Sequence, residues 1–198
     1  MDVLIVGGFL GSGKTTIIRS LIRGLVNAGN TCAIVENEIG EIGIDDEIIK
    51  EINLEVTPLF GGCVCCQISG DLLSAIQKIQ DDLNPDWVIV EMTGLALMDS
   101  IRDMFTKYGR NNIAVHTISV ADLSRWEHLV GALSRIFDRQ VEGADLIFLN
   151  KTDLAAPSEE TYKKLKELAP EAKIIELTEE SKQPDALWAL AAENFKAR

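Results

Sequence analysis

The glycine-rich stretch at residues 7–16, GGFLGSGKTT, constrains the fold more than any other part of the chain. It contains the P-loop pattern G-x-x-x-x-G-K-T, which begins at Gly8. The apolar run at 3–6 predicts a buried strand, and apolar residues at helical spacing follow the loop from 14 to about 28. In this context, backbone N–H groups and a helix N-terminus are expected to bind phosphate. The alternative is a tight turn that merely needs glycine, and the full pattern between a strand and a helix disfavours it.

Two side chains of this loop have defined chemical roles. Lys14 is expected to reach the β- and γ-phosphates, and the hydroxyl of Thr15 is expected to ligate Mg²⁺. The chain is therefore predicted to bind a nucleotide together with Mg²⁺.

Short apolar runs alternate with segments of helical period through the rest of the chain. Further strands are predicted at 31–35, 55–60, 87–90, 113–120, 145–150 and 173–177. Further helices are predicted at 72–83, from 125 to about 140, from a cap at Ser158 to 169, and at 185–195. Strands separated by helices indicate βαβ units, so the predicted class is α/β, a three-layer P-loop fold with a mostly parallel β-sheet covered by helices on both faces. Residues 1–198 are expected to form a single domain.

Composition narrows the classes of function. The formal net charge of −12 and the pI near 4.6 disfavour a nucleic-acid partner, which needs a basic face. The start MDVLIVGG lacks the basic segment of a secretory signal, and the sequence holds no apolar run of about 18 residues that could span a membrane. The predicted location is the cytoplasm, where clustered cysteines indicate metal or redox chemistry more than disulfides.

The tetrapeptide NKTD at 150–153 follows the strand pattern at 145–150 and predicts guanine recognition. The carboxylate of Asp153 can accept the N1–H and the 2-amino group of guanine, and adenine offers neither donor there. A polar strand-to-helix turn is the alternative for a four-residue pattern alone. A small-molecule kinase would share the P-loop but would not need this motif.

Acidic residues between these motifs are candidates for the Mg²⁺ site. Glu91 ends an apolar strand pattern and can hold Mg²⁺ through its water shell, while the N–H of Gly94 can sense the γ-phosphate. The acidic loop at 36–45, which includes Glu38, is expected to be a switch loop whose carboxylates approach the metal or position water. The alternatives are a solvated acid at a strand end and a plain acidic surface loop.

The stretch GGCVCC at 61–66 holds three of the four cysteines of the chain. Three thiolates near one point suit Zn²⁺, Cu⁺ or Co²⁺, and an open fourth position suits a site that hands its metal on. Candidates for the fourth ligand are Glu38, Glu41, His116, water or a second chain. A static zinc staple and vicinal-dithiol redox chemistry are the alternatives. Cys32 is expected to be a buried small hydrophobe, and the strand pattern around His116 favours an interior histidine over a ligand.

Five motifs occur in the order, and near the spacing, of a known family: GFLGSGKTT, ENEIGEIGID, GGCVCC, EMTGLA and ADLIFLNKTDL. From about residue 3 to 155 the chain resembles the CobW-like P-loop GTPases, relatives of the nickel-insertion GTPases for urease and hydrogenase. The resemblance implies binding and slow hydrolysis of GTP, an Mg²⁺ ion, and transfer of a transition metal to a client. Zn²⁺ is the first choice of metal, with Co²⁺ and Ni²⁺ as alternatives.

The resemblance also implies roles for individual residues. The phosphate-binding set is Gly8, Gly11, Ser12, Gly13, Lys14, Thr15 and Thr16, with Gly94 beside the γ-phosphate. The guanine set is Asn150, Lys151 and Asp153. The Mg²⁺ ligands are Thr15 and Glu91, and the transition-metal ligands are Cys63, Cys65 and Cys66. Lys14, Glu38 and Glu91 are the catalytic candidates.

Two departures from the family pattern concern partners more than chemistry. Many members continue into a C-terminal domain, whereas here the chain stops at Arg198, so the expectation is a G domain alone. The family form has an aromatic residue at the position of Ile39 and a small residue or Thr at Met92.

The expected partner is a client metalloprotein or a cofactor-assembly enzyme. The resemblance implies that a homodimer is possible, because two-fold dimers are typical of the family, although no sequence pattern here indicates one. A GTP-dependent switch that activates an enzyme without carrying metal is the alternative function.

Overall fold

The computed structural model describes residues 1–36, 55–58, 68–92, 98–110 and 112–195. Its strands are β1 (Asp2–Gly8), β2 (Cys32–Glu36), β3 (Glu55–Pro58), β4 (Trp87–Glu91), β5 (Ala114–Asp122), β6 (Leu146–Asn150) and β7 (Lys173–Glu176). They form a seven-stranded sheet in the order β3-β2-β4-β1-β5-β6-β7. Every pairing between these strands is parallel, which confirms the predicted α/β class with its parallel sheet.

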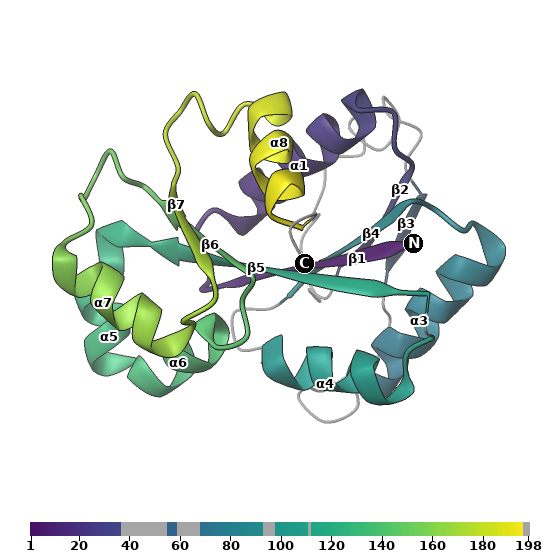
Figure 1. Cartoon of the computed structure of the whole chain (residues 1–198), viewed down its shortest axis with the longest axis horizontal. Coiled ribbons are helices and arrows are strands. Elements are labelled where there is room, and N and C mark those ends of the chain that lie inside the picture. Colours follow the sequence, from purple (N-terminus) through teal and green to yellow (C-terminus); the bar gives the residue numbers. More distant parts are fainter. Residues whose placement is uncertain (37–54, 59–67, 93–97, 111, 196–198) are drawn as a thin grey trace.

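Helices cover both faces of the sheet (Figure 1). One face carries α1 (Lys14–Asn27) and α8 (Pro184–Phe195), which pack against each other. The other face carries α3 (Ile68–Asp82), α4 (Met98–Tyr108), α5 (Trp126–Ala132), α6 (Ser134–Val141) and α7 (Glu159–Leu168). The three predicted layers are therefore present.

The central strand β1 is apolar because it is covered on both faces. Leu4 and Val6 belong to the cluster formed with α1 and α8, whereas Val3 and Ile5 belong to the cluster formed with α3 and α4. All four side chains have no solvent exposure. A strand buried on both faces is expected to be a continuous apolar run, as this one is.

The order of the strands determines where a ligand can bind. From β1 the chain crosses to β2 on the β4 side, and from β4 it returns to β5 on the opposite side of β1. Ligands of open parallel sheets bind at the carboxyl ends of the strands where the direction of winding reverses. The loop after β1 lies at this point.

The sequence predicts one helix from 125 to about 140, and this prediction is wrong, because the structure has two shorter helices there, α5 and α6. A 3₁₀ turn, η1 (Leu123–Arg125), leads into α5, and Leu133 separates α5 from α6 with φ −118° and ψ 22°. The break lets Trp126 pack edge-on against Phe137, with ring centroids 5.2 Å apart. In one straight helix these residues would be about 16 Å apart along the axis. Tertiary packing therefore overrides the helical period here.

Two other helices show how the second layer is fastened. Ser158 caps α7 as predicted, in a reciprocal capping box with Thr161. The sequence patterns did not define bounds for α4, which the structure places at Met98–Tyr108. Arg102 of α4 donates to Thr117 Oγ1 of β5 at 2.7 Å and to Asp145 Oδ2, just before β6, at 2.6 Å. This polar contact ties α4 to the edge of the sheet at which β6 begins.

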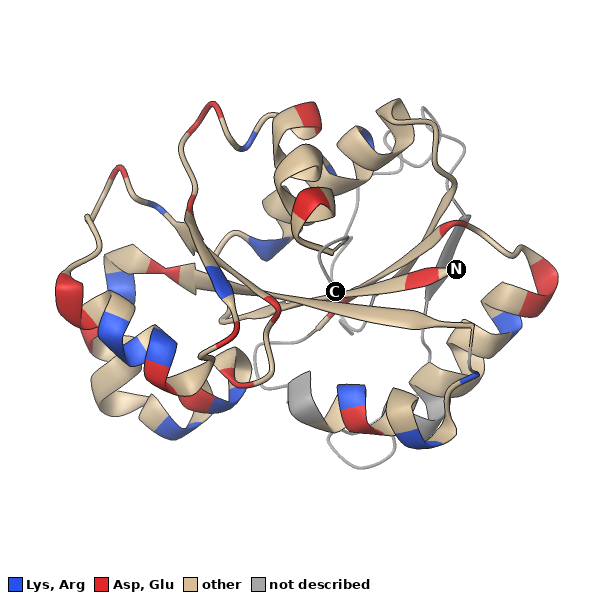
Figure 2. Ribbon diagram, viewed as in Figure 1, with Lys and Arg blue, Asp and Glu red and all other residues tan. Residues whose placement is uncertain are grey.

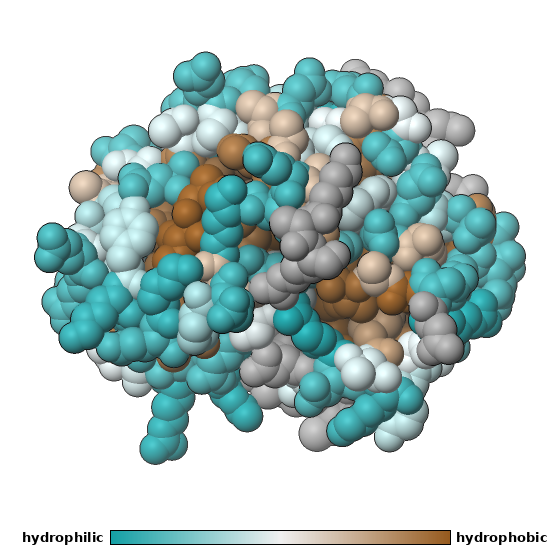
Figure 3. Space-filling model, viewed as in Figure 1, coloured by the Kyte–Doolittle hydropathy of each residue, from teal (hydrophilic) through white to brown (hydrophobic). Residues whose placement is uncertain are grey.

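The surface is mostly hydrophilic on the face shown in Figure 3, with hydrophobic residues visible between the layers. Acidic and basic residues are interspersed along α6 and α7, and no continuous basic face is seen among the described residues in this view (Figure 2). Among the residues that the structure describes, none of the helices has the length and hydrophobicity needed to cross a membrane.

The contact between α1 and α8 leads to a stability prediction. A Cβ on Gly24 of α1 would lie 2.1 Å from the Pro184 carbonyl oxygen and 2.6 Å from Trp188 Cβ of α8. We expect Gly24→Ala to lower the free energy of unfolding by about 2 kcal/mol, because the helices must move apart. Urea unfolding followed by circular dichroism measures this change.

The matched control is Gly131 of α5, where an added Cβ would meet no described atom within 4 Å. Gly131→Ala should raise the free energy of unfolding by about 0.5–1 kcal/mol, since alanine is the better helix former. Equal stabilisation by both substitutions would show that α1 and α8 do not approach this closely.

Candidate functional site

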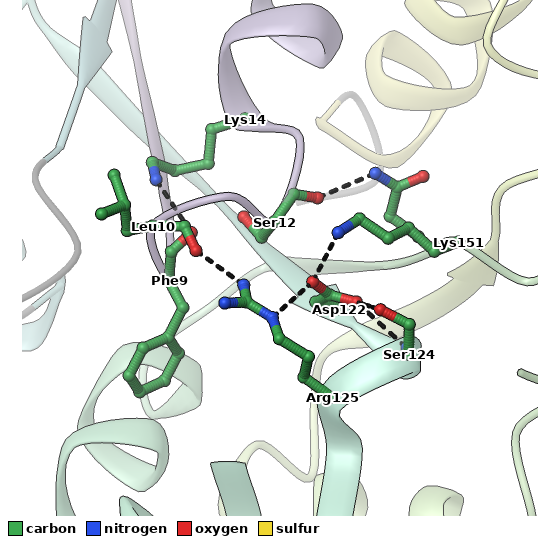
Figure 4. A network of polar contacts seen from close by, with 9 residues as sticks. Phe9, Leu10, Ser12, Lys14, Asp122, Ser124, Arg125 and Lys151 are labelled. Atoms are coloured by element: carbon green, nitrogen blue, oxygen red, sulfur yellow. Dashed lines mark hydrogen bonds and ion pairs between the residues drawn. The ribbon is translucent and has the colours of Figure 1, made fainter. Parts of the chain in front are cut away.

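The loop between β1 and α1 is a glycine-rich turn directly before a helix N-terminus. Gly11 and Gly13 have φ values of +74° and +93°, which favour glycine. The Phe9 carbonyl accepts hydrogen bonds from the Ser12 N–H at 3.0 Å and from Lys14 Nζ at 3.1 Å (Figure 4). No side chain caps α1, and its first turn contains no acidic residue. The first backbone N–H groups of α1 and their positive potential thus suit an anion.

The loop lies directly against the carboxyl ends of β5 and β6. A Cβ on Gly8 would be 2.5 Å from the Val120 carbonyl oxygen, and a Cβ on Gly13 would be 2.4 Å from Asn150 Nδ2. Asn150 Nδ2 donates to the Ser12 carbonyl at 2.8 Å. The absence of side chains on both glycines is therefore required for this close packing.

Thr15 and Glu91 form a pair of oxygen ligands at the end of β4. The Thr15 hydroxyl donates to Glu91 Oε1 at 3.0 Å, and Glu91 is only 8% exposed. A hydroxyl and a carboxylate oxygen side by side are the hard ligands that Mg²⁺ prefers. The two predicted Mg²⁺ ligands lie together and fit the ion chemically.

The guanine motif continues from the end of β6. Lys151 adopts a left-handed φ of +62°, which turns the chain, and Thr152 Oγ1 donates to the Leu177 carbonyl at 2.7 Å just beyond β7. Asp153 is exposed, so its carboxylate is open to a ligand. Two buried oxygens of the site, Ser12 Oγ and Asn150 Oδ1, have no hydrogen-bond partner among the described residues. Such buried polar atoms indicate a missing partner.

Asp122 is a site residue that the sequence patterns missed. It has no solvent exposure, and its Oδ2 accepts hydrogen bonds from Lys151 Nζ at 2.7 Å and from Arg125 Nε at 2.9 Å. Its Oδ1 accepts from the Ser124 N–H at 3.0 Å and from Ser124 Oγ at 2.6 Å (Figure 4). Burial raises the pKa of Asp122, but the hydrogen bonds from Lys151, Ser124 and Arg125 outweigh it and hold this pKa below its usual value. Asp122 is therefore a buried carboxylate with two cationic partners.

A signal for Asp122 exists in the sequence, because an acid at the end of an apolar strand is what singled out Glu91. The predicted strand ended at residue 120, whereas β5 extends to Asp122. Arg125 had no comparable signal, since its contact with the phosphate loop depends on the tertiary fold. Its Nη2 donates to the Leu10 carbonyl at 2.6 Å.

Several predicted residues lie outside the described residues: Glu38, Ile39, Glu41, Cys63, Cys65, Cys66 and Gly94. Of the described residues, Cys32 packs against the hydrophobic cluster of α1 and α8, and burial raises the pKa of its thiol to about 12. His116 lies near the start of β5, with its ring 4.5 Å from that of Phe195 and 5.4 Å from that of Trp87. It is therefore at the end of the sheet opposite to the phosphate loop.

The sequence of the chain is similar to that of a known protein family and of individual proteins within it. Residues 2–176 match the family model "CobW/HypB/UreG, nucleotide-binding domain". The zinc chaperone YjiA of Escherichia coli (strain K12) is 29% identical over an alignment of 184 residues that covers 89% of this chain and 57% of YjiA. The zinc chaperone CobW of Sinorhizobium sp is 30% identical over an alignment of 183 residues that covers 76% of this chain and 50% of CobW. The chain thus spans about half the length of the curated relatives it matches.

Solved structures agree on the fold. The Zn(II)-bound YjiA GTPase from E. coli superimposes with a TM-score of 0.67 at 25% identity, over 90% of this chain and 58% of YjiA. The hydrogenase maturation factor HypB from Archaeoglobus fulgidus has a TM-score of 0.72 at 20% identity, over 98% of this chain and 90% of HypB. The second likeness concerns the fold alone.

The buried carboxylate leads to a prediction about pH. At pH 7 we expect Asp122→Asn to lower the free energy of unfolding by about 3 kcal/mol, because Lys151 and Arg125 lose their charged partner. Since the folded pKa of Asp122 is depressed, its contribution is complete above the ordinary carboxyl pKa of about 4 and is lost as the pH falls through the folded value. The stability difference between wild type and variant should therefore be constant from pH 7 to about 5 and shrink below about 4.

Urea unfolding at a series of pH values measures this difference. Asp103→Asn, at an exposed position on α4, is the control and should change the free energy of unfolding little, because the substitution removes no buried contact. A constant difference for Asp122→Asn down to pH 3 would contradict the assignment.

Proposed function

The chain belongs to the CobW/HypB/UreG nucleotide-binding family, and from that premise we propose that it is a GTP-hydrolysing metallochaperone. It binds GTP and Mg²⁺, hydrolyses GTP slowly, and passes a transition metal to a client protein under the control of the nucleotide. The observation that carries this proposal is the convergence of the phosphate loop with Glu91 at the end of β4 and with Asn150 at the end of β6. Lys151, the next residue, is bound to Asp122 at the end of the intervening β5.

The phosphates are bound by the loop and the start of α1. Backbone N–H groups from Gly11 to Thr16 surround the phosphate oxygens, and the buried ammonium of Lys14 neutralises the charge that develops on them. Thr15 and Glu91 hold Mg²⁺, which shields the β- and γ-phosphate charge. The 3.0 Å separation of Thr15 Oγ1 and Glu91 Oε1 supports this role, because both oxygens lie close enough to be reached by one small ion.

The guanine base is held by the segment after β6. The exposed carboxylate of Asp153 accepts the two donors of guanine, while Asn150 braces the phosphate loop through the Ser12 carbonyl. Lys151 is positioned by the buried Asp122 carboxylate. The site therefore connects base recognition with phosphate binding.

The rate of hydrolysis depends on the acidic loop and the loop after β4. Glu38 positions the attacking water, and the N–H of Gly94 contacts the γ-phosphate. P-loop GTPases that have the P-loop lysine are still slow unless an arginine is added in cis or by a partner, and the sequence patterns indicate no such arginine. We therefore propose a low intrinsic rate.

The metal cargo is held by Cys63, Cys65 and Cys66. The curated relatives are named zinc chaperones and the YjiA structure is Zn(II)-bound, which supports Zn²⁺ as the cargo. Three thiolates suit Zn²⁺ and leave a coordination position through which the ion can be transferred. The γ-phosphate and Mg²⁺ order residues 36–45 and the loop after Glu91, and this ordering brings the cysteines into ligating positions.

Base selectivity is tested by Asp153→Asn. Wild type should prefer GDP to ADP by at least about a hundredfold, because an unpaired carboxylate penalises adenine. In the variant the amide can donate to the C2 carbonyl of xanthine, so the preference should shift from GDP to XDP. Titration with fluorescent nucleotides measures both affinities.

The exposed Glu167 of α7 offers a control, since Glu167→Gln removes a carboxylate without changing the site. It should leave the GDP affinity unchanged. An Asp153→Asn variant with wild-type selectivity would refute guanine recognition by this motif.

Metal binding is tested by the triple substitution of Cys63, Cys65 and Cys66 to Ser. Wild type purified anaerobically with a GTP analogue should hold one Zn²⁺, and the variant none, as measured by mass spectrometry of the metal. The affinity for Zn²⁺ should be higher with the GTP analogue than with GDP. Cys32→Ala is the matched control and should keep the metal, because Cys32 packs against the hydrophobic cluster of α1 and α8.

Equal affinities in the two nucleotide states would refute the coupling. A client that is fully activated by the triple variant would instead identify the chain as a regulatory switch that does not deliver metal.

A further inference from the structure

The phosphate loop contains a β-turn whose central peptide is held from outside the loop. The Ser12 N–H donates to the Phe9 carbonyl at 3.0 Å, which closes a four-residue turn over residues 9–12. Gly11, at the third position of this turn, has a φ of +74°, and Leu10 is not among the residues of positive φ. These are the features of a type II turn, in which the third residue has a φ of about +80°.

Type I and type II turns differ by a flip of their central peptide, here the peptide between Leu10 and Gly11. This peptide is trans, so its carbonyl and its N–H point in opposite directions. A flip would therefore reverse the direction of the Gly11 N–H. Within the described part of the chain, the Gly11 N–H has no hydrogen-bond acceptor.

Arg125 holds this peptide in one orientation. Its Nη2 donates to the Leu10 carbonyl at 2.6 Å, and its guanidinium lies 3.6 Å from the position that a Cβ on Gly11 would occupy. The carbonyl is thereby directed toward Arg125, and the Gly11 N–H is directed away from it. Figure 4 shows the guanidinium between the loop and the strand end that carries Asp122.

The guanidinium is itself anchored at a second point. Nε of Arg125 donates to Oδ2 of the buried Asp122 at 2.9 Å, and the same carboxylate also holds Ser124 and Lys151. A guanidinium is planar and has donors in fixed directions, so a bond at Nε fixes where Nη2 points. A lysine has one nitrogen on a flexible stem and cannot reproduce this two-point geometry.

We propose that Arg125 is a positioning residue of the phosphate loop, which locks the Leu10–Gly11 peptide in the type II orientation and directs the Gly11 N–H toward the phosphates beyond the α-phosphate. The proposal rests on the proposed nucleotide function for its ligand, but the locking of the peptide is a property of the nucleotide-free protein. Arg125 acts through the loop and needs no contact with the nucleotide.

The experiment compares Arg125→Ala and Arg125→Lys with wild type for binding of GDP and GMP. Loss of the hydrogen bond from the Gly11 N–H to a phosphate oxygen should weaken GDP binding about tenfold. The affinity for GMP, which lacks the outer phosphates, should change less than about twofold. Arg125→Ala and Arg125→Lys should behave alike, because a positive charge without the planar guanidinium and its two fixed donors does not lock the peptide. Added methylguanidinium should restore part of the GDP affinity of Arg125→Ala.

Two further variants complete the binding experiment. Gly11→Ala should also lower the ratio of GDP to GMP affinity, because alanine disfavours a φ of +74°. The exposed Arg135 of α6 supplies the control, and Arg135→Ala should bind both nucleotides as wild type does.

The locking of the peptide is measured without nucleotide from the Gly11 amide in ¹⁵N-glycine-labelled protein. Wild type should give one Gly11 signal, and Arg125→Ala should show microsecond-to-millisecond exchange between two orientations. An unchanged Gly11 signal in Arg125→Ala overturns the proposal. Equal losses for GDP and GMP, or full GDP affinity in Arg125→Lys, also overturn it. If wild type fails to bind GDP, the proposed function is refuted, and the Gly11 signal still decides the role of Arg125.

Discussion

The phosphate loop can pack on the carboxyl ends of β5 and β6 only because Gly8 and Gly13 have no Cβ. The Cβ of any larger residue would lie 2.5 Å from the Val120 carbonyl oxygen or 2.4 Å from the Asn150 side chain, well inside van der Waals contact. This close approach of backbone to strand ends determines where α1 begins. It therefore also determines that Lys14 and Thr15 start a helix whose N-terminus faces the site. The rest of the site is arranged around that contact.

A single buried carboxylate then joins the parts of the site that are proposed to bind the base and the phosphates. Asp122 accepts from Lys151 of the guanine motif and from Arg125, which in turn holds the Leu10 carbonyl of the phosphate loop. The chain carries a formal net charge of −12, yet cationic groups gather at this end of the sheet. Binding of an anion depends on such a local field and on oriented N–H groups more than on the total charge.

The topology explains how one end of the sheet can serve nucleotide and metal chemistry together. The phosphate loop follows β1, and Glu91 ends the neighbouring β4, so the proposed Mg²⁺ ligands Thr15 and Glu91 meet across adjacent strands. The chain continues from Glu91 into one of the loops proposed to respond to the γ-phosphate. Membership of the CobW/HypB/UreG family and the names of the zinc-chaperone relatives support a link between nucleotide state and metal transfer.

The sequence by itself determined the strands, most helices, the phosphate loop and the guanine motif, because each depends on residues close together in the chain. It also singled out Glu91, since an acid at the end of an apolar strand is a local pattern. Only the tertiary structure decided the break between α5 and α6, where Trp126 packs on Phe137, and the role of Asp122. The contact of Arg125 with Leu10 joins positions 115 apart, and no local periodicity or propensity encodes a contact of that separation.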